Sequence, residues 1–384
     1  MPASLDPSIP ARAYLDNAAT TPMRPEAVEA MLPYLSERFG NPSGAHAVSR
    51  EARKALDEAR DTVAHLLGAR PAEIVFTGGG TEADNLAILG AVAVRPGPTV
   101  CSAVEHHAVL HACDAAGDNR LAPVNAAGVV VLERLAELLD PSVSVVSVML
   151  ANNEVGTIEP LAEVVALVRE LAPAAVVHTD AVQALPWLDV AALAASADLV
   201  AVSAHKFGGP KGVGALVVRQ GVTVRPIIHG GGQERDRRSG THNVAGIVAM
   251  AAAMRATVEG RDDEVARVRV LRDRLAEGLL ATVPGCVETV DRAKKIAGNC
   301  HLSFEGVESE ELLVLLDAAG VYASAGSACA SGAVDPSHVL AAMGLPRERA
   351  LGSLRLSLGP NTTDADVDLA LATIPPAVER LRRS

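Results

Sequence analysis

The strongest chemical signal in this sequence is a lysine placed where a run of apolar residues ends. Lys206 stands in "SAHKFGGPKGVGAL", after the apolar run "ADLVAVSA" and before glycine-rich chain. A lysine at the end of a buried strand in an open α/β sheet faces the crevice where ligands bind. Partly shielded from water, its amine can lose its proton and form a Schiff base with a carbonyl compound. Lys211 has the same chemistry, but its position beyond Gly208, Gly209 and Pro210 makes Lys206 the better candidate.

A carboxylate and a glycine-rich turn offer two further ligand contacts. Asp180 in "VVHTDAVQ" follows another apolar run, where it either caps a helix or meets a buried cation such as a protonated ring nitrogen. The stretch "TGGGT" (residues 77–81) lies between a predicted strand and a predicted helix, so it is either a plain tight turn or a phosphate cradle of backbone N–H groups. A Schiff-base lysine, an acid for a ring nitrogen and a phosphate cradle are the three parts that pyridoxal 5′-phosphate (PLP) needs. The alternative is a dinucleotide, since "GGGTEA" fits that pattern with Glu105 as the ribose acid, but a nicotinamide cofactor needs no such lysine.

A cysteine within a run of small residues is the candidate nucleophile. The stretch "YASAGSACASGAVDP" surrounds Cys329 with alanine, serine and glycine and contains no second cysteine. Small residues favour an exposed and mobile loop, in which the thiol is either incidental or a nucleophile that can move. With an ordinary pKa of about 8.5, only a small fraction of the thiol is thiolate at pH 7, so nucleophilic chemistry here requires a proton acceptor.

These residues must be positioned by strands and helices that alternate from about residue 70 to 220. The runs "AEIVFT", "TVCSAV", "VSVVSVML", "AAVVHTD" and "ADLVAVSA" predict buried strands, and "TEADNLAILGAVAV", "EHHAVLHACDAAG" and "LAEVVALVRELA" predict helices. This alternation predicts an α/β fold with a mainly parallel sheet. After residue 240 the pattern becomes more helical, and we place a domain change near residue 260. We therefore expect a large domain of residues 14–260 and a small α/β domain of residues 1–13 and 261–384, which carries the Cys329 loop.

The composition limits the classes of protein. The 384 residues are 49% hydrophobic and 21% charged, as in a folded protein with a large core. The formal net charge of −12 argues against binding to nucleic acids or anionic membranes. The N-terminus is interrupted by prolines and the longest apolar run, "VAGIVAMAAAM", is short, so we expect neither a signal peptide nor a membrane span. Five scattered cysteines favour a reducing compartment, and we expect a cytoplasmic protein.

Nine motifs occur in the order in which cysteine desulfurases carry them. They are "YLDNAATTP", "GGGTEADN", "EHHAV", "NNEVGTIEP", "HTDAVQ", "SAHKFGGPKGVGAL", "GGGQERDRRSGT", "GSACASG" and "SLRLSLG". The chain therefore resembles this family, which belongs to the class V aminotransferase-like group of fold-type I PLP enzymes. The resemblance implies a large PLP-binding domain with a mainly parallel seven-stranded sheet flanked by helices, a smaller C-terminal domain, and a homodimer. The form of "GSACASG" is similar to the branch that serves iron–sulfur assembly.

The resemblance also implies roles for individual residues. The positions that match cofactor contacts are Gly80, Thr81, His106, Asn153, Asp180, Gln183, Ser203, His205, Lys206 and Thr241. Lys206 matches the lysine that holds PLP, Asp180 the acid on the pyridine nitrogen, and His106 the histidine that stacks on the ring and handles protons. Thr241 matches a residue that reaches the phosphate from the partner subunit.

The implied reaction removes sulfur from L-cysteine. Arg355 and Asn153 match the substrate contacts, with the guanidinium of Arg355 suited to the carboxylate. Cys329 matches the cysteine that accepts the sulfur as a persulfide and passes it to an acceptor such as an iron–sulfur scaffold protein. We expect no resident metal, although His107 and His111 lie four residues apart and Cys329 could ligate a cluster transiently with a partner. The alternatives are a selenocysteine lyase, another PLP-dependent C–S lyase or an aminotransferase.

Overall fold

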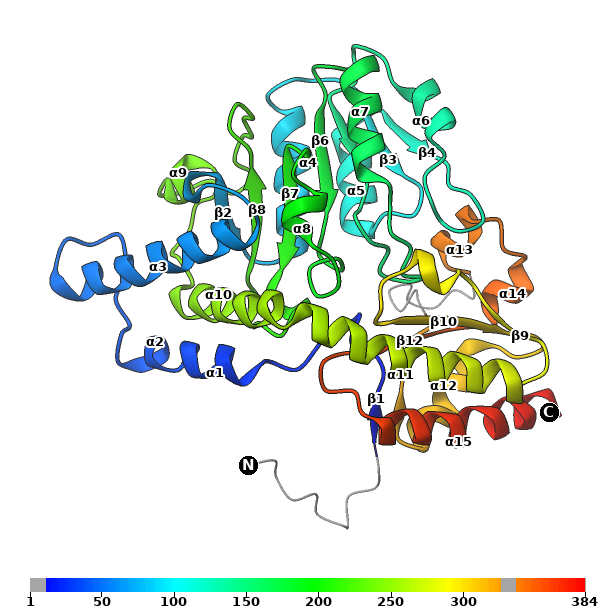
Figure 1. Ribbon diagram of the computed structural model, residues 1–384. Helices are drawn as coiled ribbons and strands as arrows, with labels where there is room; N and C mark the ends of the chain where they lie inside the picture. The colour runs from blue at the N-terminus through cyan, green and yellow to red at the C-terminus, as the bar shows by residue number, and fades with distance from the viewer. Residues whose placement is uncertain (1–11, 326–335, 384) are drawn as a thin grey trace.

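The computed structural model describes residues 12–325 and 336–383, and its largest element there is a seven-stranded sheet (Figure 1). From one edge to the other, the strands are β2 (Ile74–Thr77), β8 (Gly214–Val218), β7 (Leu199–Ser203), β6 (Val176–Asp180), β5 (Val145–Ser147), β3 (Thr99–Ser102) and β4 (Asn119–Ala122). Neighbouring strands from β7 to β4 are parallel, and β8 is antiparallel to both of its neighbours. The predicted α/β fold with a mainly parallel seven-stranded sheet is confirmed.

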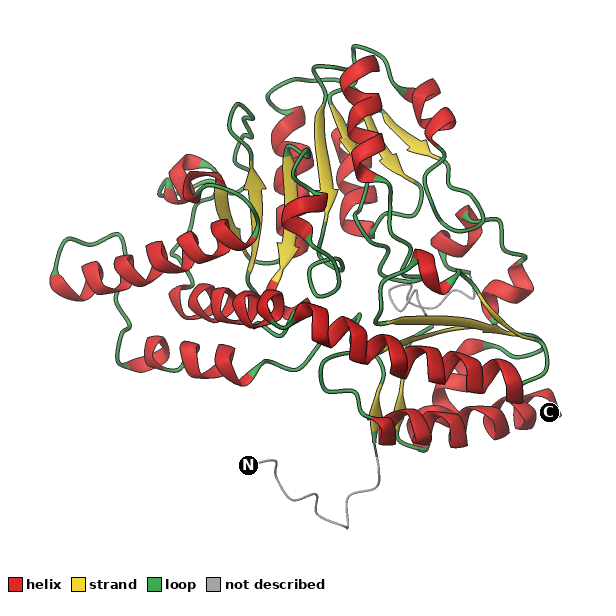
Figure 2. Ribbon diagram, viewed as in Figure 1, coloured by secondary structure: helices red, strands yellow, loops and turns green. Residues whose placement is uncertain are grey.

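Helices cover both faces of this sheet (Figure 2). On one face α4 (Gly80–Val92) and α5 (His107–Ala116) pack against side chains such as Val75, Val145 and Leu216. The helices that pack on the other face are α3 (Ala47–Leu66), α6 (Leu132–Leu138), α7 (Leu161–Leu171), α8 (Val190–Leu193) and α10 (Val244–Glu259). The central strands are thus buried on both faces, which is the reason for their continuous valine-rich runs.

A second hydrophobic cluster forms around smaller sheets. The strands β12 (Ser353–Ser357), β10 (Asn299–Phe304) and β9 (Cys286–Glu288) are antiparallel, and β1 (Ala13–Tyr14) pairs with β11 (Val321–Tyr322) in parallel. The helices that contribute to this cluster are α11 (Arg261–Thr282), α12 (Ser309–Ala318) and α15 (Asp364–Arg382). The other short elements are α1 (Pro25–Met31), α2 (Pro33–Ser36), η1 (Pro71–Glu73), η2 (Ala204–Lys206), α9 (Gln233–Asp236), η3 (Arg292–Lys294), α13 (His338–Ala342) and α14 (Arg347–Leu351).

The structure adds detail that the apolar pattern did not predict. The pattern did not separate the antiparallel strand β8 from the glycine-rich stretch that precedes it. It also missed the edge strand β4, since two of the four residues in its sequence "NRLA" are polar. Strand β5 covers only three residues of the longer run "VSVVSVML". The long helical stretch consists of two helices, α10 and α11, that meet at Gly260.

We propose that the two hydrophobic clusters correspond to two domains with a boundary near residue 260. Helix α10 packs into the cluster of the large sheet, whereas α11 packs into the second cluster. Ala13 and Leu15 also belong to the second cluster, so the N-terminal chain crosses to the large domain shortly after β1. Within the described part of the chain, no helix is both long and apolar enough to cross a membrane.

Candidate functional site

A cavity of about 340 Å³ opens where the parallel strands of the large sheet end. Its lining residues are Ala18, Ala19, Gly80, Thr81, Asp84, His106, Met149, Ala151, Asn153, Asp180, Val182, Gln183, Ser203, His205, Lys206 and Arg355. This is the edge at which open α/β sheets bind ligands. Of the predicted site residues within the described ranges, all except Thr241 therefore lie around one cavity, although they are spread over 276 positions of the sequence from Gly80 to Arg355.

Lys206 reaches the cavity from η2, the short turn that follows β7. Its Nζ donates hydrogen bonds to the carbonyl oxygens of Ala18 and Ala19, at 2.6 and 2.8 Å. Gln183 Nε2 donates to the same Ala18 oxygen at 2.7 Å. The loop after β1 thus holds the lysine amine at the cavity wall, with Gln183 beside it.

Asp180 is the last residue of β6, and its side chain is nearly buried beside the cavity. Its Oδ1 accepts a hydrogen bond from Val182 N–H at 2.8 Å. Burial, and then the nearby Asp84, raise the pKa of Asp180 to about 7. A cation placed in the cavity would stabilise the ionised carboxylate, which is the chemistry needed to hold a protonated ring nitrogen.

The glycine-rich turn forms an anion cradle at the start of α4. Gly79 has a φ of +149°, and α4 begins at Gly80 with free backbone N–H groups at its N-terminus. A Cβ on Gly80 would lie 2.9 Å from Val182 Cγ2 and 3.4 Å from Ser203 Cβ, so only glycine leaves this space open. Ser203 and His205 complete the same wall of the cavity.

Two histidines near the lysine are held in the neutral form. His106 is the N-cap of α5, where its Nδ1 accepts a hydrogen bond from Ala108 N–H at 3.1 Å. Its ring is accessible from the cavity, yet the surrounding protein displaces enough water to lower its pKa to about 4, with Lys206 as the next cause. Burial and then Lys206 likewise lower the pKa of His205 to about 4. A neutral His106 can accept a proton at pH 7.

Arg355 enters the cavity from β12. One guanidinium nitrogen donates to the Asn153 carbonyl at 3.1 Å, and another donates to Asp16 Oδ1 at 2.8 Å. Its Nε has no hydrogen-bond partner among the described residues, although the side chain is almost fully buried. A guanidinium has five N–H donors, so this arrangement leaves donors for a carboxylate.

The segment that carries Thr241 lies outside this cavity. Thr241 is exposed, and the preceding Glu234, Arg235 and Asp236 have φ values of +51°, +58° and +63°. Left-handed backbone costs about 1 kcal/mol or more for each such residue.

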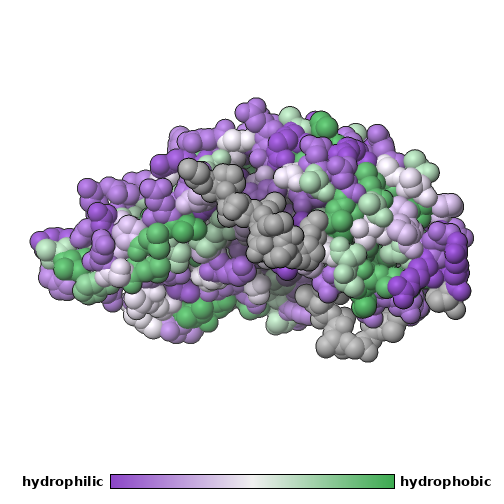
Figure 3. All heavy atoms as spheres, turned by 90° about the horizontal axis from the view of Figure 1, so that it is seen from below, coloured by the Kyte–Doolittle hydropathy of each residue, from purple (hydrophilic) through white to green (hydrophobic). Residues whose placement is uncertain are grey.

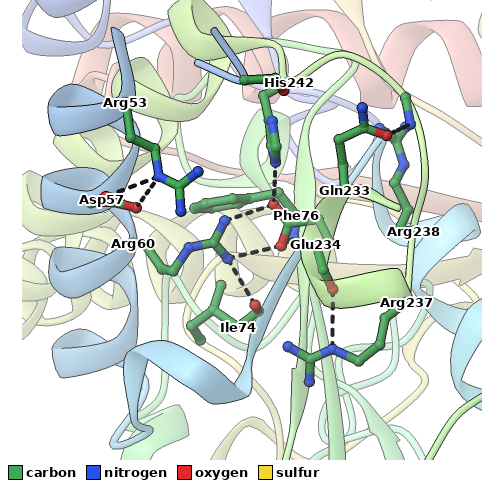
Figure 4. A network of polar contacts seen from close by, with 12 residues as sticks. Arg53, Asp57, Arg60, Ile74, Phe76, Gln233, Glu234, Arg237, Arg238 and His242 are labelled. Carbon is green, nitrogen blue, oxygen red and sulfur yellow. Dashed lines mark hydrogen bonds and ion pairs between the residues drawn. The ribbon is translucent and has the colours of Figure 1, made fainter. Parts of the chain in front are cut away.

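Glu234 secures this strained segment (Figure 4). Its carboxylate pairs with Arg60 at 2.6 Å, and it accepts hydrogen bonds from Phe76 N–H at 3.1 Å and from His242 Nε2 at 2.9 Å. Nearby, Arg238 contacts Glu82 at 2.7 Å, and Glu82 Oε2 accepts a hydrogen bond from Gly78 N–H at 2.8 Å. The segment is therefore also joined to the anion cradle of its own chain.

The structure also locates the residues of the dinucleotide and metal-site alternatives. Glu105, the ribose acid of the dinucleotide alternative, is fully buried and accepts a hydrogen bond from Met149 N–H at 2.6 Å. The ring of His107 lies near those of His111 and His338, with centroids 5.3 and 4.5 Å apart. No group of three or more His, Cys, Asp or Glu side chains in the described ranges is arranged to hold a metal ion. Cys329 lies outside the described residues.

The residues around the cavity fit PLP. The glycine cradle accepts a phosphate, Asp180 suits the ring nitrogen and Lys206 supplies the amine. The roles of the individual residues stay predictions. Asp16, Asp84 and the carbonyls of Ala18 and Ala19 also contribute to the site, and no sequence motif predicted them.

Three comparisons with known proteins agree with one another. Residues 13–370 match the family model described as Aminotransferase class-V. The chain is 47% identical to the "IscS-like cysteine desulfurase" of Mycobacterium tuberculosis over 97% of this chain and 98% of that protein. It is 44% identical to "Cysteine desulfurase IscS" of Methanosarcina thermophila, over 96% and 92% of the two chains. A solved structure titled "NifS-like protein" matches with a TM-score of 0.90 and 36% identity, over 96% of this chain and 100% of that chain.

Proposed function

The chain belongs to the aminotransferase class-V family, and we propose that it is a PLP-dependent cysteine desulfurase. It removes the sulfur atom from L-cysteine and leaves L-alanine. The observation that carries this proposal is the cavity that brings Lys206, Asp180 and Arg355 together, in a chain with curated desulfurases among its relatives.

Bound PLP supplies an electron-withdrawing ring that stabilises negative charge at the α-carbon of an amino acid. Lys206 would provide the amine that holds it, and Asp180 would pair with its ring nitrogen. The start of α4, with Gly80 and Thr81, would hold the phosphate together with Ser203 and His205. Asn153 and Gln183 line the same cavity and would contact the ring or the substrate.

The substrate is oriented and deprotonated by the chain's own groups. Arg355 binds the carboxylate, which fixes the direction of the amino group and of the thiol. Lys206 takes the proton from the α-carbon, and His106, neutral at pH 7, accepts the proton of the substrate thiol or of Cys329.

Cys329 is the proposed sulfur acceptor. Its thiolate attacks the substrate sulfur, and an S–S bond forms as the C–S bond breaks. The electron pair of the C–S bond stays on the β-carbon, which takes up a proton on the way to L-alanine, and a persulfide remains on the cysteine. We propose that the persulfide sulfur then passes to an acceptor protein such as an iron–sulfur scaffold. A cytoplasmic location is part of this proposal, and the described cysteines, all of them free thiols, support it.

We also propose a homodimer in which Thr241 reaches the phosphate of the partner subunit. Thr241 is exposed and does not line the cavity of its own chain. An apolar patch on and near α1 and α2 offers a contact surface; Figure 3 shows hydrophobic side chains gathered on this side of the molecule. The patch consists of Val28, Leu32, Leu35 and Phe39, with exposed fractions of 41%, 57%, 58% and 74%.

The test measures alanine formed from L-cysteine with a reductant present, in the PLP-loaded protein. We expect Lys206→Ala and Cys329→Ala to form no alanine, while Cys286→Ala, a change of a half-buried thiol outside the cavity, retains the parent rate. If Cys329→Ala still forms alanine, the persulfide step is wrong and a selenocysteine lyase or another C–S lyase is the better assignment. If the parent forms no alanine from L-cysteine, the proposed function is wrong.

A further inference from the structure

Three carboxyl groups and one histidine lie together at the cavity wall, and the proposed function uses only one of them, Asp180. His178 and Asp180 lie two residues apart on β6, so both side chains point to the same face of the sheet, the one that α4 covers. Helix α4 places Asp84 against them, and Glu105 lies nearby, just after β3. The side chains of all four are buried or nearly so.

The contacts in this group are incomplete. His178 Nδ1 shares a hydrogen bond with Ser147 Oγ at 2.8 Å, across the register of β5 and β6. Its other nitrogen, Nε2, lies 3.5 Å from Asp84 Oδ1, slightly longer than a normal hydrogen bond. Neither of these two atoms has a hydrogen-bond partner within the described ranges, and the same holds for Glu105 Oε2.

Charge repulsion limits how many of these groups can be ionised at the same time. A buried carboxylate without a partner is costly, and like charges a few ångströms apart raise that cost. Burial raises the pKa of Asp84 to about 8 and that of Glu105 well above its ordinary value. Burial also lowers the pKa of His178 to about 4, so the imidazole is neutral at pH 7 and can receive a hydrogen bond.

Asp180 is the carboxyl group best placed to carry the negative charge of the group. It accepts a hydrogen bond from a backbone N–H, it borders the cavity, and Lys206 faces it from η2. Asp84 on α4 and Glu105, just after β3, face it from other elements, and His178 lies two residues before it on the same strand. If Asp84 lost its proton, a second negative charge would lie beside Asp180.

We propose that Asp84 and His178 are positioning residues that hold one proton between Asp84 Oδ1 and His178 Nε2, so that Asp180 is the single anion presented to the ring nitrogen of PLP. This inference rests on the proposed function, because it concerns the same cofactor. The pair remains neutral as a unit in this arrangement. Its role is to keep the charge of Asp180 constant over the working pH range, without contact with the reacting atoms.

The first test is infrared spectroscopy of the PLP-loaded protein at pH 7, compared with Asp84→Asn, an isosteric change that cannot ionise. We expect the parent to show the carbonyl band of a protonated, buried carboxyl group, and Asp84→Asn to lack part of it. In His178→Gln the band should disappear at a different pH, because the imidazole no longer shares the proton. Spectra of Asp84→Asn identical to those of the parent would overturn the proposal. So would a carbonyl band that disappears at the same pH in His178→Gln as in the parent.

The second test follows the absorbance of bound PLP as the pH is raised from 6 to 10. In the parent, ionisation of Asp84 adds a negative charge that stabilises a protonated ring nitrogen, so the titration should show an additional step near pH 8. Asp84→Asn should lack this step and retain only the titration of the Lys206–cofactor bond. Coincident curves would overturn the proposal and leave the desulfurase function intact. By contrast, a parent that binds no PLP and has no such absorbance would contradict the proposed function.

Discussion

Arg355 and Ser324 exchange two backbone hydrogen bonds, with Ser324 N–H donating to Arg355 O at 3.2 Å and Arg355 N–H donating to Ser324 O at 2.7 Å. Because β12 is also paired with β10, the backbone of Arg355 is held from both sides. A change of the side chain therefore tests the guanidinium and leaves the strand in place.

We expect Arg355→Lys to lower kcat/KM for L-cysteine by about 10- to 100-fold, mainly through KM. An ammonium group cannot donate two parallel hydrogen bonds to a carboxylate, and a charged hydrogen bond contributes about 1.5–3 kcal/mol. The absorbance of bound PLP should not change, which separates a substrate effect from loss of the cofactor. An unchanged KM would contradict the assignment of Arg355 to the substrate carboxylate.

Gly80→Ala should weaken PLP binding by about tenfold or more, which corresponds to roughly 1.4 kcal/mol. The new Cβ would lie 2.9 Å from Val182 Cγ2 and would narrow the cradle at the start of α4. The double variant with Val182→Ala removes the clashing methyl group and should recover part of the affinity. Titration of the apo-protein with PLP measures the affinity of each variant. Equal affinity of the parent and Gly80→Ala would show that the phosphate binds elsewhere.

His106 should act as a neutral base throughout the physiological range. Burial lowers its pKa to about 4, so between pH 7 and 5 the rate should not follow the ordinary imidazole pKa of about 6.5. His106→Gln should lower kcat by about 10²–10⁴-fold, the usual contribution of a general base. A pH–rate profile of the parent with an acid limb near 6.5 that His106→Gln lacks would contradict this expectation.

Phe39→Glu should dissociate the proposed dimer and weaken PLP binding in the same variant. Phe39 is the most exposed side chain of the apolar patch on and near α1 and α2, and a buried charge at its position would be unpaired. Sedimentation at fixed protein concentration measures the dimer, and Leu121→Glu, at an exposed apolar position on β4, is the control. A variant that remains a dimer would show that the two copies meet on another surface.

The sequence predicted those parts of the site that depend on local pattern. Lys206 and Asp180 each follow a buried strand, and glycines mark the cradle, so short-range signals identify them. The contact between Asp16 and Arg355 joins residues 339 positions apart, and no local pattern reports it. In the sequence, Asp84 has the pattern of an acidic residue on the solvent side of a helix, and only the packing of α4 on the sheet buries it. Likewise, nothing in "QERD" predicts left-handed backbone at three residues that are not glycine.

The buried pair of Arg60 and Glu234 should make the protein sensitive to acid. Four hydrogen bonds and the charge of Arg60 outweigh burial and lower the pKa of Glu234 to about 2, from an ordinary value of about 4.5. The anionic form therefore stabilises the fold above pH 4.5, and this contribution is lost as the pH falls from about 4.5 to 2.

Glu234→Gln should lower the free energy of unfolding at pH 7 by about 3 kcal/mol, because Arg60 is left buried without its partner. The difference between parent and variant should shrink as the pH approaches 2, since the parent then loses the same charge. Urea denaturation at fixed protein concentration between pH 7 and pH 3 measures both effects. Glu58→Gln, which removes the exposed partner of Lys54, should change the stability by less than about 1 kcal/mol at any pH. A constant difference between parent and Glu234→Gln across this range would mean that the ionisation of Glu234 does not stabilise the segment that carries Thr241.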